Sequence, residues 1–177
     1  MDELKRIIQE TVASDTIKEE FISRLNAGAI TRDENPQSHF CTYFPAYDPQ
    51  AQAVFIGLHK KSGLWLFNGG HIDRGETPSA AVQREISEEW GIKQKLTIPT
   101  PSLLTITQIE NPKKQTCEHH FDIWYFFAVN KTNFTPDPLL LAQEFYEWGW
   151  KSVHDTRPLI KNKETLLALG EIELLFQ

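Results

Sequence analysis

The chain has 177 residues, the size of a single catalytic domain with at most a small appendage. Its net charge of -6 and pI near 5.5 argue against nonspecific binding to nucleic acid, because such binding relies on clustered lysine and arginine. The N-terminus is charged from its second residue, and no apolar run approaches the roughly 18 residues of a membrane helix. We therefore expect a cytoplasmic protein that contacts neither nucleic acid nor membrane.

Two short helices are predicted at the start of the chain. One helical stripe holds the apolar residues Leu4, Ile7, Ile8 and Val12. Thr16 and Glu19 have the spacing of a capping box, which predicts that a second helix begins there and ends near Gly28. We treat residues 1–30 as a helical extension, with a role in packing or dimer contact rather than substrate recognition, and residues 31–177 as the catalytic domain.

From Ser38 onward, short β-prone runs alternate with turn residues. The predicted strands are His39–Tyr47, Ala53–His59, Leu64–Phe67, Leu103–Ile109, Glu118–Val129 and Tyr146–Lys151. A hairpin loop is expected around Asn111–Lys114, and a longer connection from Asn130 to Pro138. A last helix is expected over Lys163–Leu175, with an apolar side of Leu166, Leu167, Leu169, Ile172 and Leu175. This order predicts an α/β fold with helices packed on a mixed sheet.

The most informative segment is Gly70–Ile92, GHIDRGETPSAAVQREISEEWGI. Thr77 and Pro78 are a good helix start, since Thr can cap and Pro is tolerated in the first turn, and Gly91 is a plausible stop. Val82, Ile86 and Trp90 form an apolar stripe on this helix. Gly69 and Gly70 are expected to give a tight exit from the preceding strand, and Gly75 a loop that returns to the helix.

Three glutamates of this helix, Glu85, Glu88 and Glu89, fall within an arc of about 100°. Carboxylates crowded on one face repel one another and raise one another's pKa values unless a cation neutralises them. Oxygen ligands favour a hard cation, so the sequence predicts Mg²⁺, with Mn²⁺ as a possible substitute. Arg84 lies four residues before Glu88, where it can hold a carboxylate.

The segment fits the pattern G-x5-E-x7-R-E-U-x-E-E-x-G-U, where U is aliphatic, and it resembles the defining box of the Nudix hydrolases. The resemblance implies an α/β/α sandwich with a central mixed sheet and cleavage of a phosphoanhydride bond. It implies metal binding by Glu85, Glu88, Glu89 and the Gly69 carbonyl, orientation of a carboxylate by Arg84, and stabilisation of the loop by Glu76. Relatives are often dimers, so a homodimer is possible.

Two positions depart from the pattern of many relatives. This chain has Asn68 where they have proline before the paired glycines, and Asp73 where they have glutamate. We expect neither residue to touch the metal ligands.

Apart from the fixed positions of the box, the sequence offers only candidates. Glu144 and Glu147 are candidates for a general base, although solvent exposure would also explain them. His71, His119 and His120 are possible phosphate contacts, although a cross-strand hydrogen bond is the expected role of a histidine on a strand. Cys41 and Cys117 have no metal-like spacing, so we expect reduced, structural thiols without a function.

The expected substrate is a small nucleotide, either a nucleoside diphosphate linked to another moiety or a nucleoside triphosphate. Two alternatives stay open. One is a module that senses a nucleotide without turnover, which would fit a degenerate box better than this complete one. The other is an isoprenoid diphosphate isomerase, which needs a reactive cysteine in the cleft.

Overall fold

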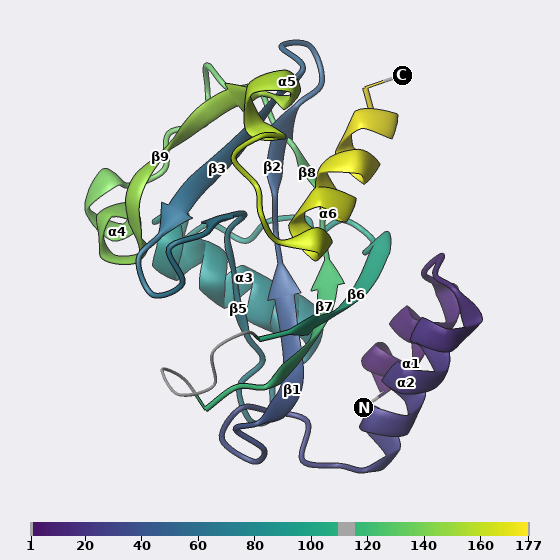
Figure 1. The fold of residues 1–177 in the computed structure, drawn as a ribbon. Helices are drawn as coiled ribbons and strands as arrows, with labels where there is room; N and C mark the ends of the chain where they lie inside the picture. Colours follow the sequence, from purple (N-terminus) through teal and green to yellow (C-terminus); the bar gives the residue numbers. More distant parts are fainter. Residues whose placement is uncertain (1, 110–115, 177) are drawn as a thin grey trace.

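A computed structural model of the protein describes residues 2–109 and 116–176 (Figure 1). Its helices are α1 (Asp2–Glu10), α2 (Asp15–Asn26), α3 (Pro78–Glu89), α4 (Pro138–Glu144), α5 (Val153–Thr156) and α6 (Lys163–Leu174). Its strands are β1 (Ser38–Tyr43), β2 (Ala46–Asp48), β3 (Ala53–His59), β4 (Trp65–Leu66), β5 (Gly69–His71), β6 (Leu103–Gln108), β7 (His119–Trp124), β8 (Phe127–Ala128) and β9 (Phe145–Ser152).

The strands form two mixed sheets. The first has the order β5-β1-β7-β6, in which β1 and β7 are parallel and the other pairs are antiparallel. The second has the order β4-β3-β2-β8, with β9 antiparallel to β3. In Figure 1, α3 lies behind the strands and α6 in front of them. The predicted α/β class, with helices on mixed sheets and helices at the N-terminus, is confirmed.

Apolar side chains fill both sides of the strands. One buried cluster joins α1, α2 and α3 to the sheets and includes Leu4, Phe21, Phe40 and Ile86. A second cluster lies under α6 and includes Trp124 and Leu169. The N-terminal helices are therefore part of the main core, as the packing interpretation predicts.

The first helix also makes a polar contact with the start of α3. The carboxylate of Glu3 accepts hydrogen bonds from the backbone amide of Ser79, at 3.1 Å, and from its hydroxyl, at 3.2 Å. The N-terminal amides of a helix lack partners within the helix and favour a negative charge. The extension thus helps to cap the helix that carries the glutamates.

Two predicted strands are divided in the structure. The predicted strand His39–Tyr47 breaks at Phe44–Pro45 into β1 and β2, and Glu118–Val129 breaks between β7 and β8. The paired glycines do not end a strand but form β5, antiparallel to β1. A Cβ at Gly69 would lie 2.5 Å from the Tyr43 ring, so this close pairing requires glycine.

The helices differ from prediction at their ends. The cap of α2 is Ser14, whose Oγ accepts from the Ile17 amide, and not Thr16. Val12 lies beyond α1 and is 85% exposed. Helices α4 and α5 were not predicted, and the loop expected around Asn111–Lys114 falls outside the described residues.

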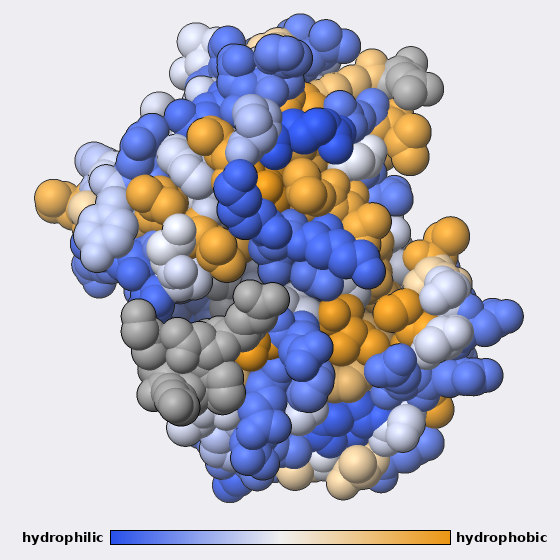
Figure 2. Space-filling model, viewed as in Figure 1, coloured by the Kyte–Doolittle hydropathy of each residue, from blue (hydrophilic) through white to orange (hydrophobic). Residues whose placement is uncertain are grey.

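The expected apolar side of α6 is only partly buried. Leu169 and Ile172 are buried together with Ala168, whereas Leu167 and Leu175 are exposed, as is Leu174. Apolar surface gathers beside the C-terminal end of the chain in Figure 2. Within the described residues, no helix combines the length and the apolar character needed to cross a membrane.

Candidate active site

The acidic helix α3 begins and ends as its sequence predicts. Thr77 caps it through its side chain, which accepts from the Ala80 amide, and Pro78 follows in the first turn. Gly75 and Gly91, which precede and follow the helix, have φ values of 85° and 72°, where glycine is favoured over other residues. Val82, Ile86 and Trp90 are buried. The apolar stripe therefore fixes α3 on the sheet, and its glutamates lie along a defined edge.

Arg84 connects the residues of this region. Its guanidinium makes a two-point contact with Glu76, at 2.8 and 2.9 Å. It also donates to Glu85 at 2.8 Å and to Glu88 at 3.0 Å. A fifth bond, of 2.9 Å, goes to the carbonyl oxygen of His71. These acceptors raise the pKa of Arg84, with Glu76 as the largest cause. Its predicted contact with Glu88 is thus one of several that join strand, loop and helix.

Glu85 lies against the backbone of β5. A Cβ at Gly70 would lie 1.9 Å from Glu85 Oε1, so only glycine leaves room for this carboxylate. Burial raises the pKa of Glu85, while the contacts with Arg84 act in the opposite direction. The carboxylate is thereby held beside a backbone that carries the paired glycines.

Glu89 is the most strongly perturbed of the three glutamates. Burial raises its pKa to about 8, and the negative charges of Glu85 and Glu144 add to this effect. The side-chain amide of Asn68 donates a hydrogen bond to Glu89 and partly offsets the rise. The expectation that Asn68 does not touch a proposed metal ligand is therefore wrong. The Asp73 carboxylate lies 3.6 Å from Arg84, and the Asp73 amide donates to Glu76 at 3.0 Å.

These residues fit a hard divalent cation. Glu85 and Glu89 are carboxylates whose ionised forms are disfavoured by burial and by neighbouring carboxylates, a cost that a bound cation would remove. The space that a Cβ at Gly70 would fill holds a carboxylate instead. Such oxygen donors are the ligands that Mg²⁺ and Mn²⁺ prefer.

The two candidates for a general base have different surroundings. Glu144, the last residue of α4, lies 3.6 Å from His59 Nε2 and 3.6 Å from Lys61 Nζ. The negative charge of Glu144 raises the pKa of Glu89. Glu147 pairs with Lys151 at 3.2 Å, and its side chain is 60% exposed. Glu144 is therefore the candidate that is electrostatically linked to the acidic helix.

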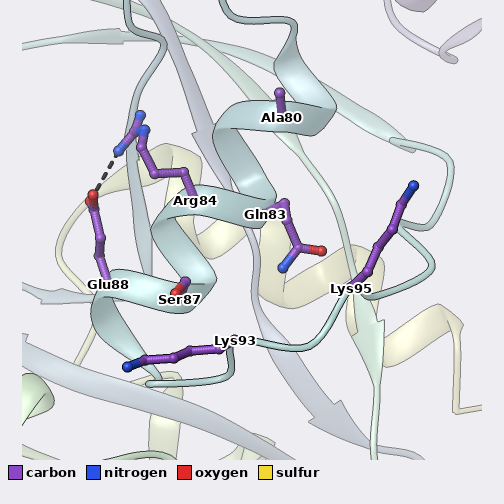
Figure 3. Close-up of a pocket in the computed structure, with 7 residues that line it drawn as sticks. All are labelled: Ala80, Gln83, Arg84, Ser87, Glu88, Lys93 and Lys95. Carbon is purple, nitrogen blue, oxygen red and sulfur yellow. Dashed lines mark hydrogen bonds and ion pairs between the residues drawn. The ribbon is translucent and has the colours of Figure 1, made fainter.

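A surface hollow of about 480 Å³ lies along α3, between the helix and the segment that follows it. Figure 3 shows Ala80, Gln83 and Ser87 on α3, with Lys93 and Lys95 beyond them. Of the residues discussed above, Arg84 and Glu88 border it. Glu85 and Glu89 do not line this hollow, so it is a feature of the outer surface of the helix.

The candidate histidines lie apart from the glutamates. The carbonyl oxygen of His71 accepts a hydrogen bond from Arg84. The ring of His71 lies 5.4 Å from that of His120 and 4.9 Å from that of His39. His120 Nε2 is buried without a hydrogen-bond partner among the described residues. The expected cross-strand hydrogen bond is therefore not made by this nitrogen. Alternation along β7 places His119 on the opposite face.

Comparison with known proteins agrees with this geometry. A model described as NUDIX domain matches residues 25–169. The nucleoside triphosphatase NudI of Enterobacter sp. (strain 638) is 26% identical over 114 residues, which cover 64% of this chain and 79% of NudI.

Solved structures show the same fold at low identity. The E. coli dihydroneopterin triphosphate pyrophosphohydrolase has a TM-score of 0.62 at 16% identity, covering 75% of this chain and 92% of that one. A C. elegans Ap4A hydrolase has a TM-score of 0.59 at 18% identity, covering 77% and 96%.

Proposed function

This chain belongs to the NUDIX family, and we propose that it is a metal-dependent pyrophosphohydrolase that cleaves a phosphoanhydride bond in a nucleotide. One observation carries the proposal. Glu85 and Glu89 are partly buried on one edge of α3, beside the backbone of β5, and Arg84 and Asn68 hold them in place. We call Glu85, Glu88 and Glu89 the acidic edge.

Glu85, Glu88 and Glu89, together with the carbonyl of Gly69, would hold Mg²⁺, with Mn²⁺ as a substitute. When bound, the ion would neutralise charge on the diphosphate and lower the pKa of the attacking water. The protein's own part is positioning. Arg84 bridges Glu85 and Glu88 through one guanidinium nitrogen and orients them, and Glu76 anchors Arg84 to the loop before the helix.

Glu144 is our proposed general base. Its side chain is about one-third exposed, and it lies 3.6 Å from His59 and 3.6 Å from Lys61. A carboxylate in such a position can act as a general base and accept the proton of the attacking water. Its electrostatic link to Glu89 supports a place near the acidic edge.

The proposed substrate is a nucleoside diphosphate linked to another moiety or a nucleoside triphosphate. Support comes from the names of the relatives, which are a nucleoside triphosphatase, a dihydroneopterin triphosphate pyrophosphohydrolase and an Ap4A hydrolase. The isomerase alternative is disfavoured because Cys41 and Cys117 are both buried, and burial raises the pKa of the Cys41 thiol.

The test is a substrate panel with Mg²⁺ or Mn²⁺, with products identified by mass spectrometry. The panel contains nucleoside triphosphates, sugar nucleotides, ADP-ribose and dinucleoside polyphosphates. We expect turnover of at least one class, and none after chelation of the metal. Hydrolysis in oxygen-18 water would place the label on one product and so identify the phosphorus that is attacked. Nucleotide binding without turnover across the panel would contradict the proposal and favour a sensing module.

A further inference from the structure

Four potential metal ligands meet on one face of the first sheet. His39 and Cys41 are two residues apart on β1 and so share a face. His71 on β5 is the register partner of Cys41, and His120 on β7 is the register partner of His39. We call these four residues the histidine–cysteine cluster. One ligand atom from each lies within 4.8 Å of those of the other three.

The three imidazole rings form a compact triangle. Ring centroids are 4.9 Å apart for His39 and His71, 4.9 Å for His39 and His120, and 5.4 Å for His71 and His120. His39 is fully buried and Cys41 nearly so. Three histidines packed against one another inside a protein require a reason, because burial of polar groups without partners is costly.

Each of the three histidines has a ring nitrogen that could bind a metal. His71 Nε2 and His120 Nε2 are buried and have no hydrogen-bond partner among residues 2–109 and 116–176. His39 Nδ1 lies 3.0 Å from the carbonyl oxygen of Asn35, so Nδ1 carries the proton and Nε2 keeps its lone pair. A histidine oriented in this way by a backbone carbonyl is typical of metal sites.

We propose that His39, Cys41, His71 and His120 form a second metal site, which binds a soft divalent transition-metal ion and most suitably Zn²⁺. Imidazole and thiolate are ligands that Zn²⁺ accepts in tetrahedral geometry. Ligand atoms in such a site are roughly 3.3–3.6 Å apart. The four ligand atoms lie within 4.8 Å of one another, so displacements of about 1 Å, through side-chain rotation, would bring them to these separations. On binding, the Cys41 thiol releases its proton to solvent, and the thiolate forms the metal–sulfur bond.

This site differs in chemistry from the acidic edge. Its donors are neutral nitrogens and one sulfur, whereas the acidic edge offers carboxylate oxygens, so the two select different ions. Both involve β5, because His71 directly follows Gly70 and its carbonyl accepts from Arg84. A metal held by His71 would fix the strand in which the box begins. The proposal does not rest on the hydrolase activity.

The test uses metal-free wild-type protein and a chromogenic chelator that competes for Zn²⁺. We expect one Zn²⁺ per chain, bound tightly enough to be withdrawn from the chelator. Co²⁺ in its place should give the visible bands of a tetrahedral ion and a sulfur-to-cobalt charge-transfer band. No competition with the chelator, or Co²⁺ spectra without the charge-transfer band, would overturn the assignment.

Variants then identify the ligands. His120→Ala should weaken Zn²⁺ binding at least 100-fold, and Cys41→Ser should abolish the charge-transfer band. Cys117→Ser is the matched control, because Cys117 Sγ lies 3.8 Å from His39 Nε2 but outside the cluster; this variant should keep both signals. If Cys117→Ser loses the band while Cys41→Ser keeps it, the assignment of Cys41 is wrong. The wild-type Co²⁺ spectrum remains decisive if a variant fails to fold.

Discussion

The acidic edge and the histidine–cysteine cluster both contact the three-residue strand β5, at adjacent residues, yet they are built from different groups. Gly70 of β5 faces Glu85 through bare backbone, whereas the ring of His71 joins two other imidazoles. Arg84 donates hydrogen bonds to two carboxylates of the acidic edge, whereas His71 and His120 of the cluster have buried ring nitrogens without a hydrogen-bond partner among the described residues. If both proposals hold, one strand serves a hard and a soft ion, because the backbone of Gly70 faces one site and the side chain of His71 faces the other.

The contrast also shows what a linear motif can reveal. The glutamates are three and four residues apart on one helix, so their proximity follows from helical geometry alone. The members of the cluster come from three strands and are separated by up to 81 positions in the sequence. Only the register of β1 with β5 and β7 brings them together.

The largest expected effect separates the two sites. Glu89→Gln removes the negative charge of the most perturbed ligand while keeping its shape and its contact with Asn68. We expect kcat to fall by about 10³-fold or more, because metal binding and charge stabilisation are both weakened, whereas Zn²⁺ affinity should be unchanged. Steady-state kinetics and the chelator competition measure the two quantities. Near-normal turnover would refute the assignment of Glu89 as a ligand.

A smaller effect is expected at the proposed base. Glu144→Gln should lower kcat by about 10²-fold, within the range for loss of a general base, and leave KM within a few-fold. Glu147→Gln is the matched control, since Glu147 is exposed and paired with Lys151; its rate should stay within about twofold of the wild type. Equal losses in both variants would mean that Glu144 acts through local charge alone. Neither substitution should alter Zn²⁺ binding.

The smallest effect concerns Asn68, whose amide supports Glu89 from outside the ligand set. Asn68→Ala should raise the Mg²⁺ concentration for half-maximal activity by about tenfold, the lower end of the range for loss of a residue that orients a metal ligand. Saturating Mg²⁺ should restore most of the rate. The measurement is an Mg²⁺ titration of activity at fixed substrate. A loss of rate that Mg²⁺ cannot restore would place Asn68 in contact with the substrate instead.

Much of the acidic edge could be predicted from the sequence because its contacts are local. The cap at Thr77, the apolar stripe and the contact of Arg84 with Glu88 all depend on helical spacing within about 14 residues. The contact of Asn68 with Glu89 spans 21 positions between a strand and a helix. The periodicity of apolar residues in the sequence does not predict such a contact.

The elements that prediction missed have similar causes. Helix α4 has seven residues and follows a proline-rich connection, so its signal is too short to distinguish from a loop. The break in the first predicted strand falls at Pro45, a residue that lacks a backbone donor. The histidine–cysteine cluster is not visible in the sequence, because the spacing of Cys41 and Cys117 carries no information about it. The informative relation was the register of Cys41 with His71.

The contact between Glu3 and Ser79 has a consequence for the order in which the chain folds. It spans 76 positions, so α1 is synthesised long before its partner exists. A helix of nine residues is only marginally stable alone in water. The extension should therefore acquire protection from hydrogen exchange together with α3 rather than ahead of it, which makes α1 a reporter of whether the acidic helix has docked.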